Sequence, residues 1–257
     1  MTNNKLKEKS QGGGKACGAF VNIGSTAVVE VLARSGLDAV IIDTEHGPFD
    51  VELAEKLVMA AELHGITPLV RAKDASRASV LKLLDIGAMG LVIPFIKSVD
   101  EVRQIVAYGK YRPLGDRGYG LTRKNGFGLD PMVADGLEGY FNWSNENTLI
   151  LPQCETVEAL EQIEDIAALP GVGGIFVGPF DLSVSMGLTR QFGHPDFLAA
   201  LARVLKACKD AGKLCFTLAT DPREGREKLE QGFDGVFTCD TLLLAGSTAQ
   251  YVKGLRE

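Results

Sequence analysis

The chain has few of the residues that mark disulfide-rich, zinc-finger or membrane proteins. Its five cysteines are odd in number, and no two of them form a CxxC pair. This pattern argues against a disulfide framework or a CxxC metal site, and it predicts reduced thiols in the cytoplasm. No apolar run approaches the length of a membrane span. Residues 1–15 are polar and glycine-rich, unlike a signal peptide, and we expect them to form a flexible tail.

Positive charge is also scarce. The chain has 27 Lys and Arg residues against 33 Asp and Glu residues, a net charge of −6, and no basic cluster longer than Arg123-Lys124. These numbers argue against a nucleic-acid partner and against an anionic membrane surface. With 46% hydrophobic and 23% charged residues, the composition is otherwise that of an ordinary globular domain.

What the chain does have is a regular alternation of strand-like and helical patterns. The strand-like runs are 16–22, 39–43, 68–72, 91–96, 148–153, 174–177, 213–218 and 235–238. The helical patterns are 27–34, 51–63, 78–84, 99–108, 157–168, 196–210, 222–230 and 242–255. This order, with strands that are apolar throughout, predicts a buried parallel sheet covered by helices. Eight units predict an α/β fold, a single-domain (β/α)8 TIM barrel over residues 16–257; an open doubly wound sheet is the alternative.

One segment interrupts this repeat. Residues 111–147 form a long insertion before the fifth strand, with a glycine-rich run from Arg112 to Gly120. Loops of this length are usually functional or disordered. An anion-binding loop, a covering lid and a subunit contact all remain open. We expect a short helix at 135–145, around the only tryptophan, to pack on the barrel rim.

Polar residues gather where the strands of this barrel would end, which is where such barrels place their catalytic groups. His46 is the only one of three histidines at a strand end, and neighbouring carboxylates can raise its basicity. Arg71 ends an apolar strand, where a buried guanidinium needs an anion. The full set of candidates is Asp43, Glu45, His46, Arg71, Gln153, Glu155, Asp181 and Ser183.

Two of these carboxylates suggest a metal site. Glu155 and Asp181 follow successive buried strands, where an unpaired carboxylate is costly. Because the two strand ends are neighbours, both carboxylates can converge on a divalent cation that prefers oxygen ligands. Each residue also precedes a helical pattern and could instead be a helix N-cap.

Taken together, these motifs resemble the HpcH/HpaI aldolase family, whose members are metal-dependent (class II) pyruvate aldolases such as 4-hydroxy-2-oxoheptanedioate aldolase and 2-dehydro-3-deoxyglucarate aldolase. The resemblance spans residues 17–244 in family order. The motifs that carry it are Asp43-Thr44-Glu45-His46-Gly47-Pro48, Arg71, Pro152-Gln153-Cys154-Glu155 and Gly178-Pro179-Phe180-Asp181-Leu182-Ser183.

The resemblance implies a carbon–carbon lyase that cleaves a 4-hydroxy-2-oxo acid to pyruvate, or a related 2-oxo acid, and an aldehyde. Glu155 and Asp181 would bind Mg²⁺ or Mn²⁺, with Co²⁺ as an alternative. Gln153 and the backbone of Phe180 and Asp181 would hold the 2-oxo acid. Phe180 and Phe20 replace an alanine and a tryptophan of some members, so the aldehyde is not identified.

The resemblance also implies the roles of the remaining catalytic residues and an assembly. His46 would be the general acid/base, with Asp85 and Asp43 as its partners, and Arg71 would stabilise the enolate. The family is commonly hexameric, as a trimer of dimers, so we expect a homo-oligomer.

Two other functions stay open. Lys97 or Lys73 near a strand end would suit a Schiff-base aldolase, although Glu155 and Asp181 would then have no role. A barrel that binds a metal or a 2-oxo acid without catalysis is the second alternative. A phosphate-binding barrel enzyme is disfavoured, because the loops after the seventh and eighth strands lack a glycine-rich cradle.

Overall fold

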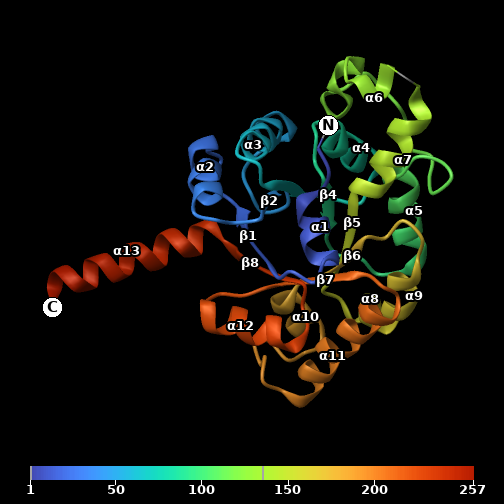
Figure 1. Ribbon diagram of the computed structural model, residues 1–257. Coiled ribbons are helices and arrows are strands. Elements are labelled where there is room, and N and C mark those ends of the chain that lie inside the picture. Colours follow the sequence, from blue (N-terminus) through green and yellow to red (C-terminus); the bar gives the residue numbers. More distant parts are fainter. Residues whose placement is uncertain (1, 135) are drawn as a thin grey trace.

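Eight parallel strands close into a barrel in sequence order, with helices around it, as a computed structural model of residues 2–134 and 136–257 shows (Figure 1). This confirms the single-domain TIM barrel and excludes the open sheet. The strands are β1 (Ala16–Val21), β2 (Ala39–Asp43), β3 (Thr67–Arg71), β4 (Gly90–Ile93), β5 (Leu149–Cys154), β6 (Gly174–Val177), β7 (Leu214–Leu218) and β8 (Gly235–Cys239). The helices that follow them include α2 (Thr26–Arg34), α3 (Val51–Leu63), α4 (Arg77–Asp85), α5 (Val99–Gly109), α8 (Val157–Glu161), α9 (Ile163–Ala168), α10 (Pro179–Ser185), α11 (Pro195–Asp210), α12 (Pro222–Gln231) and α13 (Asp240–Arg256).

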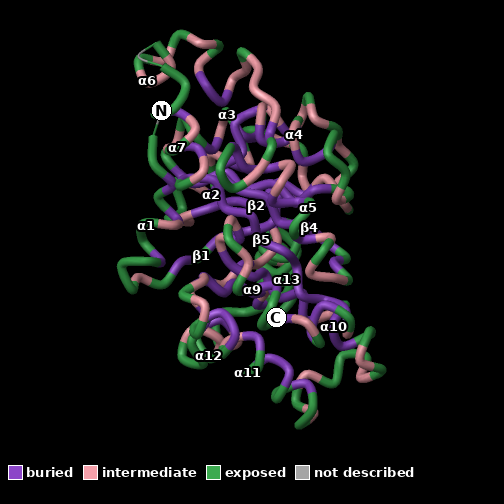
Figure 2. The backbone as a smooth tube through the Cα atoms, turned by 90° about the vertical axis from the view of Figure 1, so that its right-hand side faces the viewer, coloured by how far each residue is buried: buried purple, intermediate pink, exposed green. Residues whose placement is uncertain are grey.

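The strands are apolar along their whole length because both of their faces are covered. Figure 2 shows the buried backbone at the centre and the exposed backbone around it. On the inner face, the rings of Phe20, Phe176 and Phe237 meet edge to face with centroids 5.5–6.5 Å apart. Residues that alternate with them along the strands, such as Val21 and Ile175, pack against the helices outside. The barrel interior is therefore a packed core, and the site must lie on one of its ends.

The segment predicted to be a flexible tail contains a short helix, α1 (Lys5–Gln11). Leu6 is fully buried in the inner core of the barrel, and its backbone N–H donates to Thr67 Oγ1 at the start of β3. The side-chain amide of Asn4 donates to the carbonyls of Met89 and Asn147, both at 2.9 Å. A single leucine between polar residues has no hydrophobic period, so the sequence does not reveal that it closes the amino-terminal end of the barrel. Met1, the first residue of the expected tail, lies outside the described residues.

The described part of the insertion contains three short helices, η1 (Arg123–Gly128), α6 (Pro131–Ala134) and α7 (Leu137–Asn147). The expected helix at 135–145 corresponds to α7, and its first residue lies outside the described residues. Buried lysines attach the insertion to the base of the barrel. The ammonium of Lys110 donates to the carbonyls of Asn145 and Thr148, and that of Lys124 donates to Ala88. Burial lowers the pKa of both lysines to about 7.

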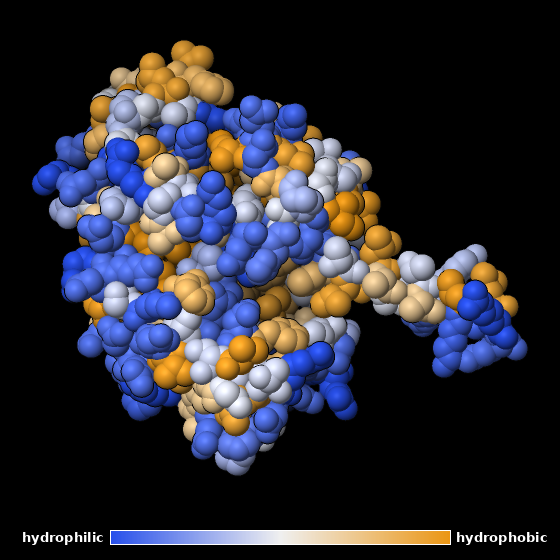
Figure 3. Space-filling model, turned by 180° about the vertical axis from the view of Figure 1, so that it is seen from behind, coloured by the Kyte–Doolittle hydropathy of each residue, from blue (hydrophilic) through white to orange (hydrophobic). Residues whose placement is uncertain are grey.

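The last helix, α13, extends away from the barrel instead of packing along it (Figure 1). Only Asp240 of this helix is buried. Figure 3 shows hydrophobic surface where α13 leaves the body of the molecule, and the residues there are Leu242, Leu243 and Leu244, exposed by 44–59%. Across the described ranges 2–134 and 136–257, none of the helices combines the length and hydrophobicity required to cross a membrane.

We expect the substitution Leu6→Ala to destabilise the protein, because it leaves a cavity in the closed end of the barrel. The free energy of unfolding should fall by about 2–5 kcal/mol, as measured by denaturant titration. Leu63→Ala is the matched control, since Leu63 is 81% exposed at the end of α3 and should change stability little. Equal stability of Leu6→Ala and wild type would show that residues 1–15 behave as a flexible tail in solution.

Candidate active site

A buried ion pair joins the carboxyl-terminal ends of β2 and β3. Asp43 and Arg71 lie opposite each other in the register of these strands. Arg71 Nε and Nη2 donate to Asp43 Oδ1 and Oδ2 at 2.9 and 2.7 Å. Burial alone would raise the pKa of Asp43, but the hydrogen bonds and the charge of Arg71 hold this pKa below its usual range. The sequence predicted an anion beside Arg71, and Asp43 supplies it.

Asp43 also sets the turn that follows β2. Its Oδ1 accepts the backbone N–H groups of Glu45 and His46 at 3.1 and 3.3 Å, and its Oδ2 accepts the side-chain amide of Asn22 at the end of β1. The turn is tight at Gly47, where a Cβ atom would lie 2.1 Å from the carbonyl oxygen of Asp43. Asp43 therefore contacts the backbone of His46, and not its imidazole ring.

The next two residues bring a carboxylate and an imidazole to the barrel mouth. Glu45 Oε2 lies 3.2 Å from Arg71 Nη1 and 4.0 Å from His46 Nε2. Burial raises the pKa of Glu45 despite the nearby positive charge of Arg71. The imidazole of His46 is 69% exposed, so it can reach a bound ligand from the solvent side. The sequence offered Asp43 and Glu45 as the carboxylates that could raise the basicity of His46, and Glu45 is the one beside the imidazole ring.

A third carboxylate, that of Glu155, lies buried after β5. It is only 5% exposed, its Oε1 accepts the backbone N–H of Phe95 at 2.6 Å, and its Oε2 accepts the side-chain amide of Gln153. Burial raises the pKa of Glu155 to about 7, and the negative charges of Asp181 and Glu45 add to this shift. No signal in the sequence identified Phe95, because its contribution is a backbone N–H placed by the fold.

Glu155, Asp181, Glu45 and His46 line one hollow of about 310 Å³ at the carboxyl-terminal end of the barrel. Asp181 enters from the first turn of α10, where its side chain is exposed. The structure therefore brings together most of the residues that the sequence singled out, from β2, β3, β5 and β6. Neither Glu155 nor Asp181 accepts an N-cap hydrogen bond from a following helix, since Thr156 caps α8.

The donors around this hollow suit a hard divalent cation. Glu155 is a buried carboxylate beside two further carboxylates, Asp181 and Glu45, and Arg71 already pairs with Asp43. The buried side-chain amide oxygen of Gln153, Oε1, has no hydrogen-bond partner. Among residues 2–134 and 136–257, no cluster of three or more His, Cys, Asp or Glu side chains is arranged to hold a metal. Two carboxylates with room beside them leave coordination positions for a ligand or water.

A close backbone approach shapes the wall of this hollow at Gly178, between β6 and α10. A Cβ atom at this position would lie 2.8 Å from Glu155 Oε2 and 2.8 Å from Gln153 Nε2. Any larger residue would therefore displace both polar side chains. The glycine of the Gly-Pro-Phe-Asp motif is required for space at the site.

One sequence candidate lies at the other end of the barrel, and the side chains of two others make contacts outside the hollow. Asp85 ends α4, just before β4, and therefore lies near the base of the barrel, where its carboxylate pairs with Arg117 at 2.8 Å. The structure of one chain does not bring Asp85 to His46. The ring of Phe180 packs against Phe192. The hydroxyl of Ser183 donates to the carbonyl of Phe180 and stabilises the start of α10.

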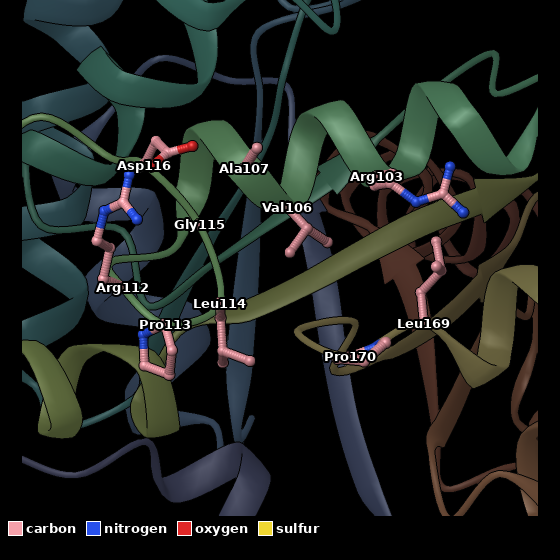
Figure 4. A pocket seen from close by; sticks show the side chains of 10 residues that line it. All are labelled: Arg103, Val106, Ala107, Arg112, Pro113, Leu114, Gly115, Asp116, Leu169 and Pro170. Atoms are coloured by element: carbon pink, nitrogen blue, oxygen red, sulfur yellow. Dashed lines mark ion pairs between the residues drawn. The ribbon is translucent and has the colours of Figure 1, made fainter.

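A different hollow, of about 320 Å³, lies between α5 and the insertion (Figure 4). Its two guanidinium groups already pair with carboxylates, Arg112 with Asp116 at 2.7 Å and Arg103 with Asp100. Its walls come from the last turns of α5 and the loop before β6, which lie away from the carboxyl ends of the strands. It has none of the chemistry found at the barrel mouth.

Comparison with known proteins shows what this chain is similar to. A sequence model of the HpcH/HpaI aldolase/citrate lyase family matches residues 16–241. A hydroxypyruvate/pyruvate aldolase from Cupriavidus necator is 31% identical over 93% of this chain and 88% of its own length. A 2-keto-3-deoxy-L-rhamnonate aldolase from Salmonella schwarzengrund is 32% identical over 95% and 90%, respectively. The crystal structure of an HpcH/HpaI aldolase/citrate lyase family protein from Burkholderia cenocepacia superimposes with a TM-score of 0.90 at 30% identity, covering 99% of this chain and 100% of that one.

The raised pKa of Glu155 has a measurable consequence for the metal-free protein. Between its ordinary pKa of 4.5 and about 7, the folded state keeps a proton that the unfolded state releases. Stability is therefore lost as pH rises through this window, by up to about 3 kcal/mol above pH 7. In chelator at pH 8, Glu155→Gln should unfold at a higher temperature than wild type, while at pH 4 the two should match in a thermal scan.

Asp181→Asn is the control for this measurement, because Asp181 is exposed and its charge is solvated in the metal-free state. It should gain much less stability at pH 8 than Glu155→Gln. If Glu155→Gln melts at or below the wild-type temperature at pH 8, the burial of an uncompensated carboxylate is refuted.

Proposed function

This chain belongs to the HpcH/HpaI aldolase/citrate lyase family, and from that premise we propose that it is a divalent-metal-dependent pyruvate aldolase. The reaction is the reversible cleavage of a 4-hydroxy-2-oxo acid to pyruvate, or a related 2-oxo acid, and an aldehyde. The observation that carries this proposal is the convergence of Glu155, Asp181 and the Asp43–Arg71 pair on one end of the barrel, with His46 at the mouth.

Glu155 and Asp181 are the proposed metal ligands. Mg²⁺ and Mn²⁺ suit two carboxylates with remaining positions for substrate and water, and Co²⁺ is an alternative. A bound ion would polarise the keto group of the 2-oxo acid as a Lewis acid. The buried amide of Gln153 and the backbone at Phe180 and Asp181 orient the 2-oxo acid beside these ligands.

Arg71 is the proposed stabiliser of the enolate oxygen. A guanidinium carries five N–H donors, of which Asp43 accepts two. The pair also holds the guanidinium rigid, so that little reorganisation is needed when negative charge develops. A preorganised donor of this kind typically contributes about 3 kcal/mol to the transition state.

His46 is the proposed general acid/base for the oxygen that becomes the 4-hydroxyl. In cleavage it accepts the hydroxyl proton as the carbon–carbon bond breaks, and in synthesis it returns that proton. Glu45, 4.0 Å from its Nε2, can stabilise the protonated ring. Asp43 acts on this histidine through the backbone N–H that it accepts. Asp85 remains a predicted partner of His46. Within this chain it pairs with Arg117 instead, so an Asp85 that contacts His46 would have to belong to another copy of the chain.

The Schiff-base alternative has little support from the surroundings of the two lysines. Lys73 and Lys97 are both exposed, and the ammonium of Lys97 lies 4.5 Å above the ring of Phe95. A catalytic lysine needs a depressed pKa, which burial or a neighbouring cation provides. Both lysines are exposed at the rim and therefore lack buried surroundings of this kind.

We further propose that the enzyme is a homo-oligomer, with a hexamer of three dimers as the assembly that the family resemblance implies. The exposed leucines of α13 and the apolar hollow of about 630 Å³ beside α2 support this. In a barrel each helix normally covers the strands, so an extended α13 suits packing on a second copy. The free thiols among the described residues support a reducing compartment, and we propose the cytoplasm.

The central test asks whether the protein makes an enolate, because this needs no knowledge of the aldehyde. Pyruvate in deuterated buffer with Mn²⁺ should exchange its methyl protons when the protein is added, as followed by NMR. Chelator should abolish the exchange, and Arg71→Ala should reduce it sharply. Arg71→Lys should restore only part of it, because an ammonium lacks the planar two-donor geometry.

Exchange that persists in chelator and is trapped by borohydride would replace this mechanism with a Schiff base on Lys97 or Lys73. Absence of exchange in the folded, metal-bound protein would favour a binding barrel or another oxo acid.

The assembly is tested by placing a charge on α13. Leu243→Glu should convert the oligomer to smaller species in light scattering, because the charge would be buried at the contact. Leu63→Glu, at an exposed leucine of α3, is the control and should leave the mass unchanged. A wild-type protein that is monomeric at micromolar concentration would exclude the proposed assembly.

A further inference from the structure

Phe95, at the mouth of the site, has two energetically unfavourable features: its backbone conformation and the exposure of its apolar side chain. Its backbone φ is +55°, a left-handed conformation that residues other than glycine rarely adopt. Its ring is 62% exposed to solvent. Outliers of this kind persist where the surrounding structure enforces them, and they cluster at functional sites.

The surrounding structure enforces this conformation from both sides. The backbone N–H of Phe95 donates to Glu155 Oε1 at 2.6 Å. At the next residue, the carbonyl of Ile96 accepts the hydroxyl of Thr156, also at 2.6 Å. The segment after β4 is therefore attached at two adjacent residues to the segment after β5. With the backbone held in this way, the ring of Phe95 is directed outward.

The ring forms part of the wall of the hollow that contains Glu155 and Asp181. Of the residues around this hollow, Phe95 and Val184 alone are large and apolar. Both are more than half exposed, so they lie toward the open side, whereas Glu155 is buried. The ammonium of Lys97 lies 4.5 Å above the ring and supports it by a cation–π contact.

The hollow therefore has a polar interior, and its open side carries the apolar side chains of Phe95 and Val184 next to the exposed His46 and Asp181. In the proposed reaction the 2-oxo acid occupies the interior, beside Glu155 and Gln153. The aldehyde must then approach from the open side, and its substituent meets Phe95 and Val184. We propose that Phe95 is a specificity-determining residue that selects aldehydes with an apolar substituent, aromatic or aliphatic, over small hydroxylated ones. This inference rests on the proposed aldolase function and names the acceptor class for that site.

The test compares two aldehydes as acceptors in the addition of pyruvate, using the full chain with Mn²⁺. Benzaldehyde presents an apolar ring and glycolaldehyde a small hydroxylated group. We expect wild type to have the higher kcat/KM with benzaldehyde. Phe95→Ala should lower the ratio of the two kcat/KM values about tenfold, the usual scale for one hydrophobic contact, and mainly through the KM for benzaldehyde. Phe95→Tyr should keep the ratio within a small factor.

The chain offers a closely matched control in Phe127. It also has a left-handed φ, +57°, and its ring is also 62% exposed, but it lies in η1 of the insertion. Phe127→Ala should leave the ratio unchanged. Phe95→Gly provides a second variant in case Phe95→Ala folds poorly, since it removes the ring, keeps the N–H to Glu155 and relieves the left-handed strain. It should show the same loss of benzaldehyde preference.

Two results would overturn the inference. One is an equal loss with both aldehydes in Phe95→Ala and Phe95→Gly, because a merely structural residue leaves the ratio intact. The other is a wild-type preference for glycolaldehyde. Failure of the proposed aldolase function would look different: wild type would neither exchange pyruvate protons nor add either aldehyde. In that case the proposed acceptor preference would be wrong as well.

Discussion

The buried pair of Asp43 and Arg71 is the contact on which this end of the barrel depends. The two residues are register partners on adjacent strands, so the ion pair joins the strands where backbone pairing ends. Removing one partner of a buried pair typically costs about 3–5 kcal/mol, because the other charge is left without compensation. Asp43 also accepts the N–H groups that place Glu45 and His46. One carboxylate thus positions a guanidinium, a second carboxylate and an imidazole.

The same pair explains why the other half of the site is electrostatically incomplete. Arg71 is engaged by Asp43 and approached by Glu45, so its charge is largely balanced within its own half. Glu155 and Asp181 then line the same hollow without a lysine or arginine among the described residues around it. Such an arrangement is unfavourable without a ligand. In the function we propose, a divalent ion would balance these charges, so that stability of the metal-free protein is given up in exchange for binding the ion.

Much of this could be predicted from sequence where a pattern repeats along the chain. The barrel follows from eight alternations of apolar strand and helix, and the strand-end rule then indicates Asp43, Arg71 and Glu155. Features that arise from a single residue could not be predicted. Leu6 lies in a segment without hydrophobic periodicity. The left-handed backbone at Phe95 could not be predicted either, because no glycine stands at that position to indicate it. The roles given to Gln153, Phe180 and Asp85 by family resemblance stay predictions, and the partner of Asp85 within this chain is Arg117.

The buried position of Leu6 constrains how the protein can fold during its synthesis. This leucine is synthesised before most of the inner-core residues with which it packs, and these include Leu149, Leu214 and Phe237. At a synthesis rate of about 5–20 residues per second, the last of these follows Leu6 by roughly 10–50 s. Throughout that interval the barrel is incomplete, and Leu6 lacks part of the core that buries it in the finished protein. The barrel can therefore close only when β8 has been made. Nascent chains that stall earlier keep apolar core residues exposed and are prone to aggregation.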